Sequence, residues 1–149
     1  MTGDLRELYQ ELIFDHYKQP RNCHVLLDAN RQADGHNPLC GDRVTVYLKV
    51  EDGIIRNATF EGDGCAIATA SASLMTEALK GKPLAEVAHM FEGFHDMVTD
   101  TDAAAHPELG KLEALAGVRN FPARVKCATL AWHTLNAALK QQTAPVSTE

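Results

Sequence analysis

The 149-residue sequence lacks long apolar runs and blocks of basic residues. No segment approaches the roughly 20 apolar residues that a membrane-spanning helix needs, and residues 1–22 lack the apolar core of a signal peptide. Its 20 acidic and 14 basic residues give a formal net charge of -6, without the basic tract that releases counterions from nucleic acid. These absences argue against membrane insertion and nucleic-acid binding, and we expect a cytoplasmic protein.

Cysteine is also scarce, and no C-x-x-C pair occurs among Cys23, Cys40, Cys65 and Cys127. The long spacing excludes a local zinc knuckle and a thioredoxin-type redox pair. Because disulfides seldom persist in a reducing compartment, we expect these thiols to be buried, metal-bound or reactive. Spacing alone leaves open both a metal site shared across the fold and a set of ordinary buried thiols.

The hydrophobic periodicities predict an α+β fold. Helical spacing over residues 5–16 indicates an amphipathic helix that the proline of "KQPRN" ends. A weak edge strand within residues 25–35 is followed by an alternating run at 43–50 and a returning run at 54–62. Both runs are rich in β-branched residues, and they predict a β-hairpin turning at Gly53. The remaining expected elements are four helices, at residues 66–83, 84–98, 107–117 and 121–142. Strands followed by helices favour a small antiparallel sheet of about three strands with helices packed on one face.

Length and composition fit a single domain. The chain is 45% hydrophobic, which is enough apolar material for one core at this length. No internal repeat or linker divides it. We therefore expect one domain over residues 1–142, followed by a flexible C-terminal tail over residues 143–149.

The three cysteines after Cys23 fall at the ends of predicted elements. Cys40 lies in the loop before the first hairpin strand, Cys65 at the start of the small-residue helix, and Cys127 in about the first turn of the last helix. Unpaired amide groups at a helix N-terminus favour a thiolate, so we expect this effect at Cys65 and Cys127. Such positions suit reactive or metal-bound thiols.

Four blocks occur in order along the chain: "DHYKQPRN", "NPLCGDR", "FEGDGCAIATASASLMTEALKGK" and "FPARVKCATLAWHTL". Together they resemble the U-type iron–sulfur assembly proteins, the IscU/NifU/SufU superfamily, across about residues 5–140. The likeness is to the SufU branch. The scaffold branch carries "LPPVK" and a histidine where this chain has "FPARV" and Lys126, and residues 97–120 look like the insertion of the SufU branch. The resemblance implies a SufE/NifU-like architecture.

The resemblance also implies a metal site and its ligands. Cys40, Asp42, Cys65 and Cys127 match the four metal ligands of the family, and the metal in SufU-type proteins is zinc, which takes tetrahedral N, S and O ligands. An extended Cys40-Gly41-Asp42 would turn both ligand side chains to the same side. The negative charge of such a site would be partly offset by nearby cations, for which the candidates are Arg43, Arg124 and Lys126.

The function that the resemblance implies is sulfur transfer for iron–sulfur cluster assembly in the SUF system. The protein would accept persulfide sulfur from a PLP-dependent cysteine desulfurase of the SufS type, with Cys40 as the catalytic acceptor, and downstream SUF assembly proteins are further possible partners. A partner histidine is expected to replace Cys40 at the zinc and free its thiolate. At most, the protein is thus an enzyme of the zinc-dependent sulfurtransferase kind.

Two other functions stay open at this point. One is an IscU-like scaffold on which an iron–sulfur cluster is assembled and transferred, and Lys126 in place of histidine counts against it. The other is a purely structural zinc site, against which the carboxylate ligand counts, because structural zinc sites mostly use cysteine and histidine. His133, six residues beyond Cys127, is not expected to be a ligand. Helical spacing favours core packing for a set of apolar residues, Met90, Phe91, Phe94 and Met97.

Overall fold

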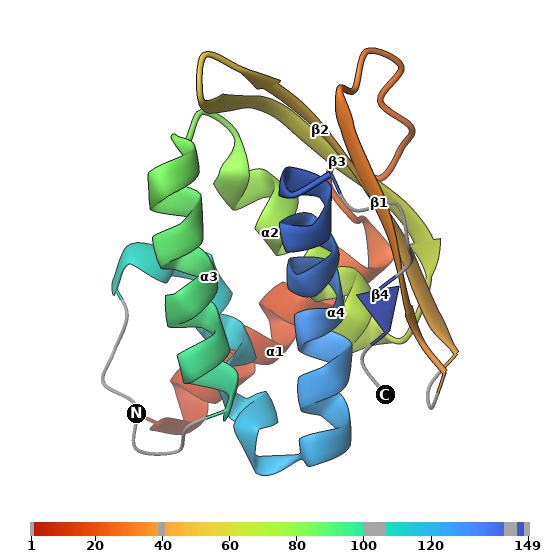
Figure 1. Ribbon diagram of the computed structural model, residues 1–149. Helices are drawn as coiled ribbons and strands as arrows, with labels where there is room; N and C mark the ends of the chain where they lie inside the picture. The colour runs from red at the N-terminus through yellow and green to blue at the C-terminus, as the bar shows by residue number, and fades with distance from the viewer. Residues whose placement is uncertain (1, 39–40, 100–106, 142–145, 148–149) are drawn as a thin grey trace.

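The computed structural model describes residues 2–38, 41–99, 107–141 and 146–147. Two layers are visible in Figure 1, a curved sheet and a group of helices beside it. In chain order the elements are α1 (Thr2–Lys18), β1 (Arg31–Asn37), β2 (Asp42–Glu51), β3 (Ile54–Asp63), α2 (Ala66–Leu79), α3 (Leu84–Thr99), the 3₁₀ helix η1 (Pro107–Asn120), α4 (Pro122–Leu139) and β4 (Val146–Ser147). Within the described part, no helix is both long and apolar enough to cross a membrane.

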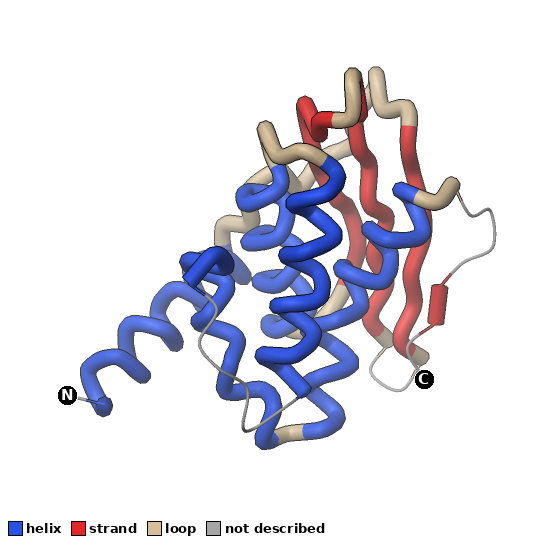
Figure 2. Tube along the Cα trace, turned by 60° about the vertical axis from the view of Figure 1, so that its left-hand side comes forward, coloured by secondary structure: helices blue, strands red, loops and turns tan. Residues whose placement is uncertain are grey.

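The sheet has the order β3-β2-β1-β4, with antiparallel pairing among its first three strands. Figure 2 shows the helices gathered on one side of the strands, and the core lies between the two layers. Val46, Leu48 and Phe60 are buried there, each no more than 3% exposed. The predicted α+β fold, with helices on one face of a small antiparallel sheet, is confirmed.

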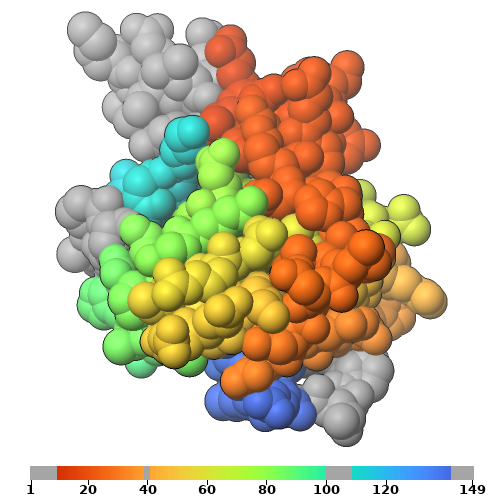
Figure 3. Space-filling model, turned by 90° about the horizontal axis from the view of Figure 1, so that it is seen from above, coloured from red at the N-terminus to blue at the C-terminus, as the bar shows by residue number. Residues whose placement is uncertain are grey.

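The strict in-and-out alternation predicted for the hairpin does not hold. Tyr47 and Thr59 point away from the core residues of their strands and are nevertheless buried. The segment between α1 and β1 covers them: the backbone N–H of Phe60 donates to the carbonyl of Asn22 at 2.9 Å, and Leu26 is buried. Seen from above, this segment, in orange, lies against the yellow β2–β3 hairpin (Figure 3).

Three predicted boundaries differ from the structure. The edge strand begins at Arg31, later than residues 25–35 implied, because the side chain of Asn30 brackets the backbone of Val50 with hydrogen bonds of 2.7 and 2.8 Å. Residues 107–120 form a 3₁₀ helix broken at Gly110, where φ is 54°. In the predicted tail, Val146 and Ser147 pair with β1 as a short parallel strand, and the limits of the domain at residues 142 and 143 stay a prediction.

Small residues let α2 approach its neighbours closely. Ala70 and Ala72 are at most 1% exposed, and the hydroxyl of Ser71 donates to the carbonyl of Ala128 on α4 at 2.6 Å. Because small side chains leave little between the backbones, α2 and α4 lie close enough to share a site at their N-terminal ends. This packing positions two of the predicted ligands, Cys65 before α2 and Cys127 on α4.

Candidate metal centre

Three of the four predicted ligands come together in the fold. The nearest ligand atoms of Asp42, Cys65 and Cys127 all lie within 4.8 Å of one another. Asp42 is the first residue of β2, Cys65 precedes α2, and Cys127 lies in α4. Asp42 and Cys127 are buried at 1% and 0% exposure, whereas Cys65 is half-buried. The centre is therefore closed on the side of the core and accessible at Cys65.

The carboxylate of Asp42 is held by the backbone in front of α2. Its Oδ1 accepts a hydrogen bond from the N–H of Cys65 at 2.9 Å, and its Oδ2 lies 3.9 Å from the Cys65 sulfur. Gly64 makes this approach possible, because a Cβ on it would lie 3.1 Å from Oδ1, tighter than ordinary van der Waals contact. The sequence analysis missed this role of Gly64, for which the glycine of "DGC" was the available signal.

Cys65 is the N-cap residue of α2, as predicted. Its sulfur accepts a hydrogen bond from the N–H of Ala68 at 3.4 Å. The unpaired N–H groups of the first turn and the positive end of the helix dipole both favour negative charge at this position. The start of α2 thus places the Cys65 sulfur at the positive end of a helix.

Cys127 lies in the second turn of the last helix, slightly later than the expected first turn or so. It is the sixth residue of α4, and its sulfur lies 3.6 Å from the carbonyl of Ala123, one turn earlier. Its position is therefore past the free N–H groups of the helix start. The prediction that this N-terminus stabilises a Cys127 thiolate is wrong, because the helix begins five residues before it.

The positive charge beside Cys127 comes from Arg124 and not from the N-terminus of α4. A hydrogen bond to the Cys127 thiol, together with the negative charges of Cys65 and Cys127, raises the pKa of the Arg124 guanidinium. Among the described residues, the other two candidate cations, Arg43 and Lys126, form no hydrogen bond or ion pair with this centre. The structure thus singles out Arg124 from the three.

The predicted geometry of the Cys40 loop is wrong at Gly41. Gly41 has φ of 72°, a left-handed conformation that glycine adopts without strain, so the chain turns there instead of running extended. Alternation along a strand does not bring Cys40 and Asp42 to one side. Cys40 itself lies outside the described residues, so its place in the ligand set stays a prediction.

The donor atoms fit zinc. With Zn–S near 2.3 Å and Zn–O near 2.1 Å, a tetrahedral ion separates a sulfur from an oxygen ligand by about 3.6 Å, and the observed separation between Cys65 Sγ and Asp42 Oδ2 is 3.9 Å. Two thiols and a carboxylate within 4.8 Å of one another therefore need only small adjustments to share one ion. A fourth ligand would complete the tetrahedron.

The prediction of core packing for four apolar residues agrees with the structure. Met90, Phe94 and Met97 are at most 5% exposed and belong to the core, and Phe91 packs against it. His133 is absent from the cluster of possible metal ligands found among the described residues. Core packing at helical spacing is confirmed for this set.

Residues 8–145 match the family described as NifU-like N terminal domain. The chain belongs to this family. The match covers β1 to β3, most of α1, the later helices and all three described ligands, so the resemblance drawn from the four sequence blocks is confirmed.

Relatives of this NifU-like domain include both a sulfurtransferase and a cluster assembly scaffold. The zinc-dependent sulfurtransferase SufU of Bacillus subtilis (strain 168) is 45% identical over 141 residues, which cover 95% of each chain. The iron–sulfur cluster assembly scaffold protein IscU of Streptococcus pyogenes serotype M1 is 41% identical over 137 residues, covering 92% of this chain and 86% of that protein.

Solved structures show the same fold. A candidate iron–sulfur cluster assembly scaffold protein for the SUF system, from Fervidobacterium islandicum, superposes with a TM-score of 0.82 at 35% identity, covering 87% of this chain and 94% of that one. The N-terminal part of a NifU-like protein from Brucella abortus also gives 0.82, at 24% identity and with 92% and 95% covered. At 24% identity, the likeness to the Brucella abortus protein supports the fold alone.

Proposed function

We propose that this NifU-like domain is a zinc-dependent sulfur acceptor, or sulfurtransferase, for iron–sulfur cluster assembly in the SUF system. The observation that carries the proposal is the meeting of Asp42, Cys65 and Cys127, three donors from remote parts of the chain, with ligand atoms within 4.8 Å of one another. The 45% identity to a zinc-dependent sulfurtransferase supports the same function.

The ligands have different roles in this proposal. Zinc, when bound, would keep the thiols deprotonated and protect them from oxidation. Cys65 and Cys127 would hold the zinc ion from two packed helices, and Asp42 completes the ligand set from the start of β2. Asp42 is also fixed by the N–H of Cys65, which orients the carboxylate before any ion arrives.

Cys40 is the proposed sulfur acceptor. Its neighbour Gly41 is exposed, and a Cβ built on Gly41 meets no atom within 4 Å, so the chain is open to a partner at Gly41. The thiolate of Cys40 attacks the outer sulfur of the partner's persulfide. A new S–S bond forms on Cys40 while the partner's S–S bond breaks and its cysteine leaves as a thiolate, so no oxidant or reductant is consumed.

The partner we propose is a PLP-dependent cysteine desulfurase of the SufS type, with downstream SUF assembly proteins as later acceptors. A mostly apolar groove of about 730 Å³ opens beside the centre, between α1, α2, η1 and α4. Arg124 lines this groove and also contacts the thiols, and Phe121 at its rim is 63% exposed. An apolar surface continuous with the reactive centre is suited to docking a protein.

The test uses zinc-loaded protein mixed with a SufS-type desulfurase and cysteine. We expect the wild-type protein to raise cysteine turnover, whereas Cys40→Ser should still bind the desulfurase and give no stimulation. Mass spectrometry should find one added sulfur, about 32 Da, on the peptide with Cys40. Cys23→Ser is the matched control, because Cys23 is an exposed thiol outside the centre. Stimulation by Cys40→Ser at the wild-type level, or extra sulfur on Cys65 or Cys127, would contradict the proposal.

A scaffold for cluster assembly is the second candidate, favoured by the relatives named IscU. Anaerobic reconstitution with iron and sulfide separates the two functions. Zinc binds such sites more tightly than ferrous iron, so the zinc-loaded protein should resist cluster formation if it is a sulfur acceptor. Rapid loss of zinc to a stable, transferable cluster would instead support the scaffold.

A further inference from the structure

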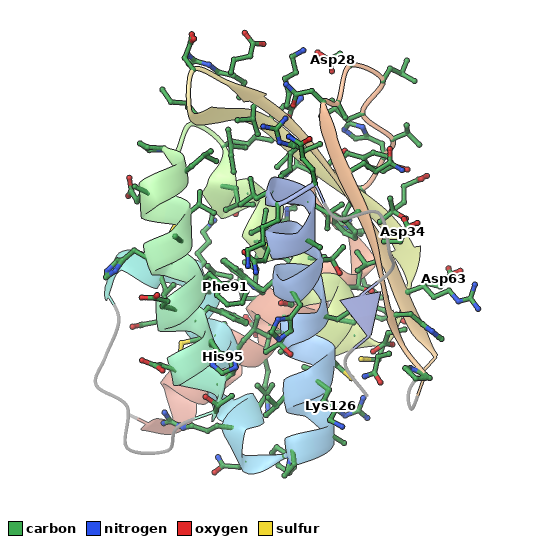
Figure 4. All side chains as sticks on the ribbon, viewed as in Figure 1. Asp28, Asp34, Asp63, Phe91, His95 and Lys126 are labelled. Carbon is green, nitrogen blue, oxygen red and sulfur yellow. The ribbon has the colours of Figure 1, made fainter. Side chains whose placement is uncertain are left out.

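Two histidines from different helices meet where α3 packs on α4. The ring centres of His95, on α3, and His133, on α4, are 6.2 Å apart, and their planes are inclined at 72°. Phe91, one turn before His95, contacts both rings. Figure 4 shows Phe91 and His95 on the side of α3 that faces α4. The imidazoles therefore approach each other from two separate elements.

The nitrogens of these two rings lack hydrogen-bond partners in the described part of the chain. Among the described residues, the His95 and His133 rings contact only other rings, and no hydrogen bond to a ring nitrogen is found. His133 is half-buried, and its burial, assisted by the charge of His95, lowers its pKa. Since half-buried polar groups usually have a partner, an uncharged imidazole in this position is available as a ligand.

We propose that His95 and His133 form a second Zn²⁺ site, separate from the cysteine centre. On a tetrahedral zinc, with Zn–N near 2.0–2.1 Å, two imidazoles place their ring centres about 5 Å apart, and the observed 6.2 Å is within about 1 Å of that separation. The χ2 torsion of histidine is broad, so small rotations can turn a nitrogen of each ring toward a shared ion. Imidazole is a good ligand for zinc.

The site lies away from the sulfur chemistry. His133 follows Cys127 by six residues, which is about 9 Å along a helix axis. No further Cys, His, Asp or Glu from the described residues joins the pair in a three-ligand cluster. Water would fill the remaining zinc positions, so this ion should exchange more readily than one held by the cysteine centre.

Packing around Phe91 brings the two imidazole rings into contact. A bound ion would in addition give the ring nitrogens of His95 and His133 a shared partner. It would join the middle of α4 to the C-terminal half of α3, and it should stabilise the folded chain, because the pair does not exist in the unfolded chain.

The experiment starts from protein whose zinc content has been measured after dialysis. Calorimetric titration with further Zn²⁺ should reveal one additional ion per wild-type chain, with shifts of the His95 and His133 imidazole NMR signals. His95→Gln and His133→Gln should each abolish this event and the accompanying rise in melting temperature. His89→Gln is the matched control, because His89 is also exposed on α3, and it should bind the extra ion like wild type.

Absence of an additional ion in the wild type, or its equal binding by both glutamine variants, would overturn the proposal. Melting in the absence of added zinc shows whether the variants fold. If His133→Gln does not fold, the exposed position His95 decides the outcome alone. Failure of the cysteine centre would appear separately, as missing zinc after dialysis, while the imidazole signals would still report on this second site.

Discussion

The backbone N–H of Cys65 donates to Oδ1 of Asp42 at 2.9 Å, while Oδ2 of the same carboxylate lies 3.9 Å from the Cys65 sulfur. One oxygen thus secures the first residue of β2 to the start of α2, and the other lies near the thiol of Cys65. Asp42 therefore has a structural and a ligand role, and substitutions can separate them.

Asp42→Asn keeps an acceptor for the Cys65 N–H but removes the charge, whereas Asp42→Ala removes both. We expect zinc retention against a competing chelator to fall in the order wild type, Asn, Ala, with Cys65→Ser and Cys127→Ser retaining least. Without zinc, only the alanine variant should lose stability, by about 1 kcal/mol, because it leaves the partly buried N–H of Cys65 without its partner. Metal analysis and denaturant unfolding measure the two effects, and full zinc retention by Asp42→Ala would contradict a ligand role.

Arg124→Gln should release zinc severalfold faster than wild type. Its guanidinium interacts with both Cys65 and Cys127 and offsets the negative charge of the ligand set. Lys126→Gln is the control, since Lys126 is a neighbouring cation without a described bond to the centre. The difference between the two variants should shrink at high salt, because Arg124 is exposed and its charge is screened. Equal release rates at low salt would show that Arg124 is an ordinary surface cation.

Stability should decrease as the pH falls below about 6.5, partly because of His16. Its Nδ1 lies 2.7 Å from Oγ of Ser73, which also accepts from the N–H of Arg21. Burial, and then the charge of Arg21, lower the pKa of His16 below the ordinary 6.5. Between the lowered pKa of His16 in the folded protein and the ordinary 6.5, His16 binds a proton more readily in the unfolded chain. The stability that His16 contributes is therefore present above pH 6.5 and is lost below it.

Denaturant unfolding of His16→Gln at several pH values tests this contribution. The slope of unfolding free energy against pH should be smaller than in wild type between pH 5 and pH 6.5. Some slope should persist, because burial also lowers the pKa of His133. His24→Gln, at an exposed position, should keep the wild-type slope, and an unchanged slope in His16→Gln would refute the assignment.

Gly35→Ala should destabilise the fold by about 1–3 kcal/mol through overpacking. A Cβ on Gly35 would overlap the hydroxyl of Thr134, which is held by its 2.8 Å hydrogen bond to the carbonyl of Leu130. Gly117→Ala is the control, because a Cβ at that position meets no atom within 4 Å. Denaturant unfolding should show a lower midpoint for the first variant only, and equal midpoints would mean that β1 and α4 pack less tightly than described.

The order of helices and strands follows from the sequence because hydrophobic periodicity is a local property. The alternation in residues 43–50 and the β-branched run at 54–62 predicted β2 and β3, and the small residues after Cys65 predicted a helix that packs closely. The residues proposed as ligands came from the four family blocks. Their spacing alone could not distinguish a shared metal site from separate buried thiols.

Only the tertiary structure brought Asp42, Cys65 and Cys127 together, because their meeting depends on the packing of α2 against the sheet and α4. It also showed that Arg124, among three candidate cations, contacts the thiols, and it brought His95 to His133. Each of these relationships joins segments that are remote in the chain or depends on where a helix begins. Local patterns determine which residues can form helices and strands, whereas the contacts that create a site arise when those elements pack.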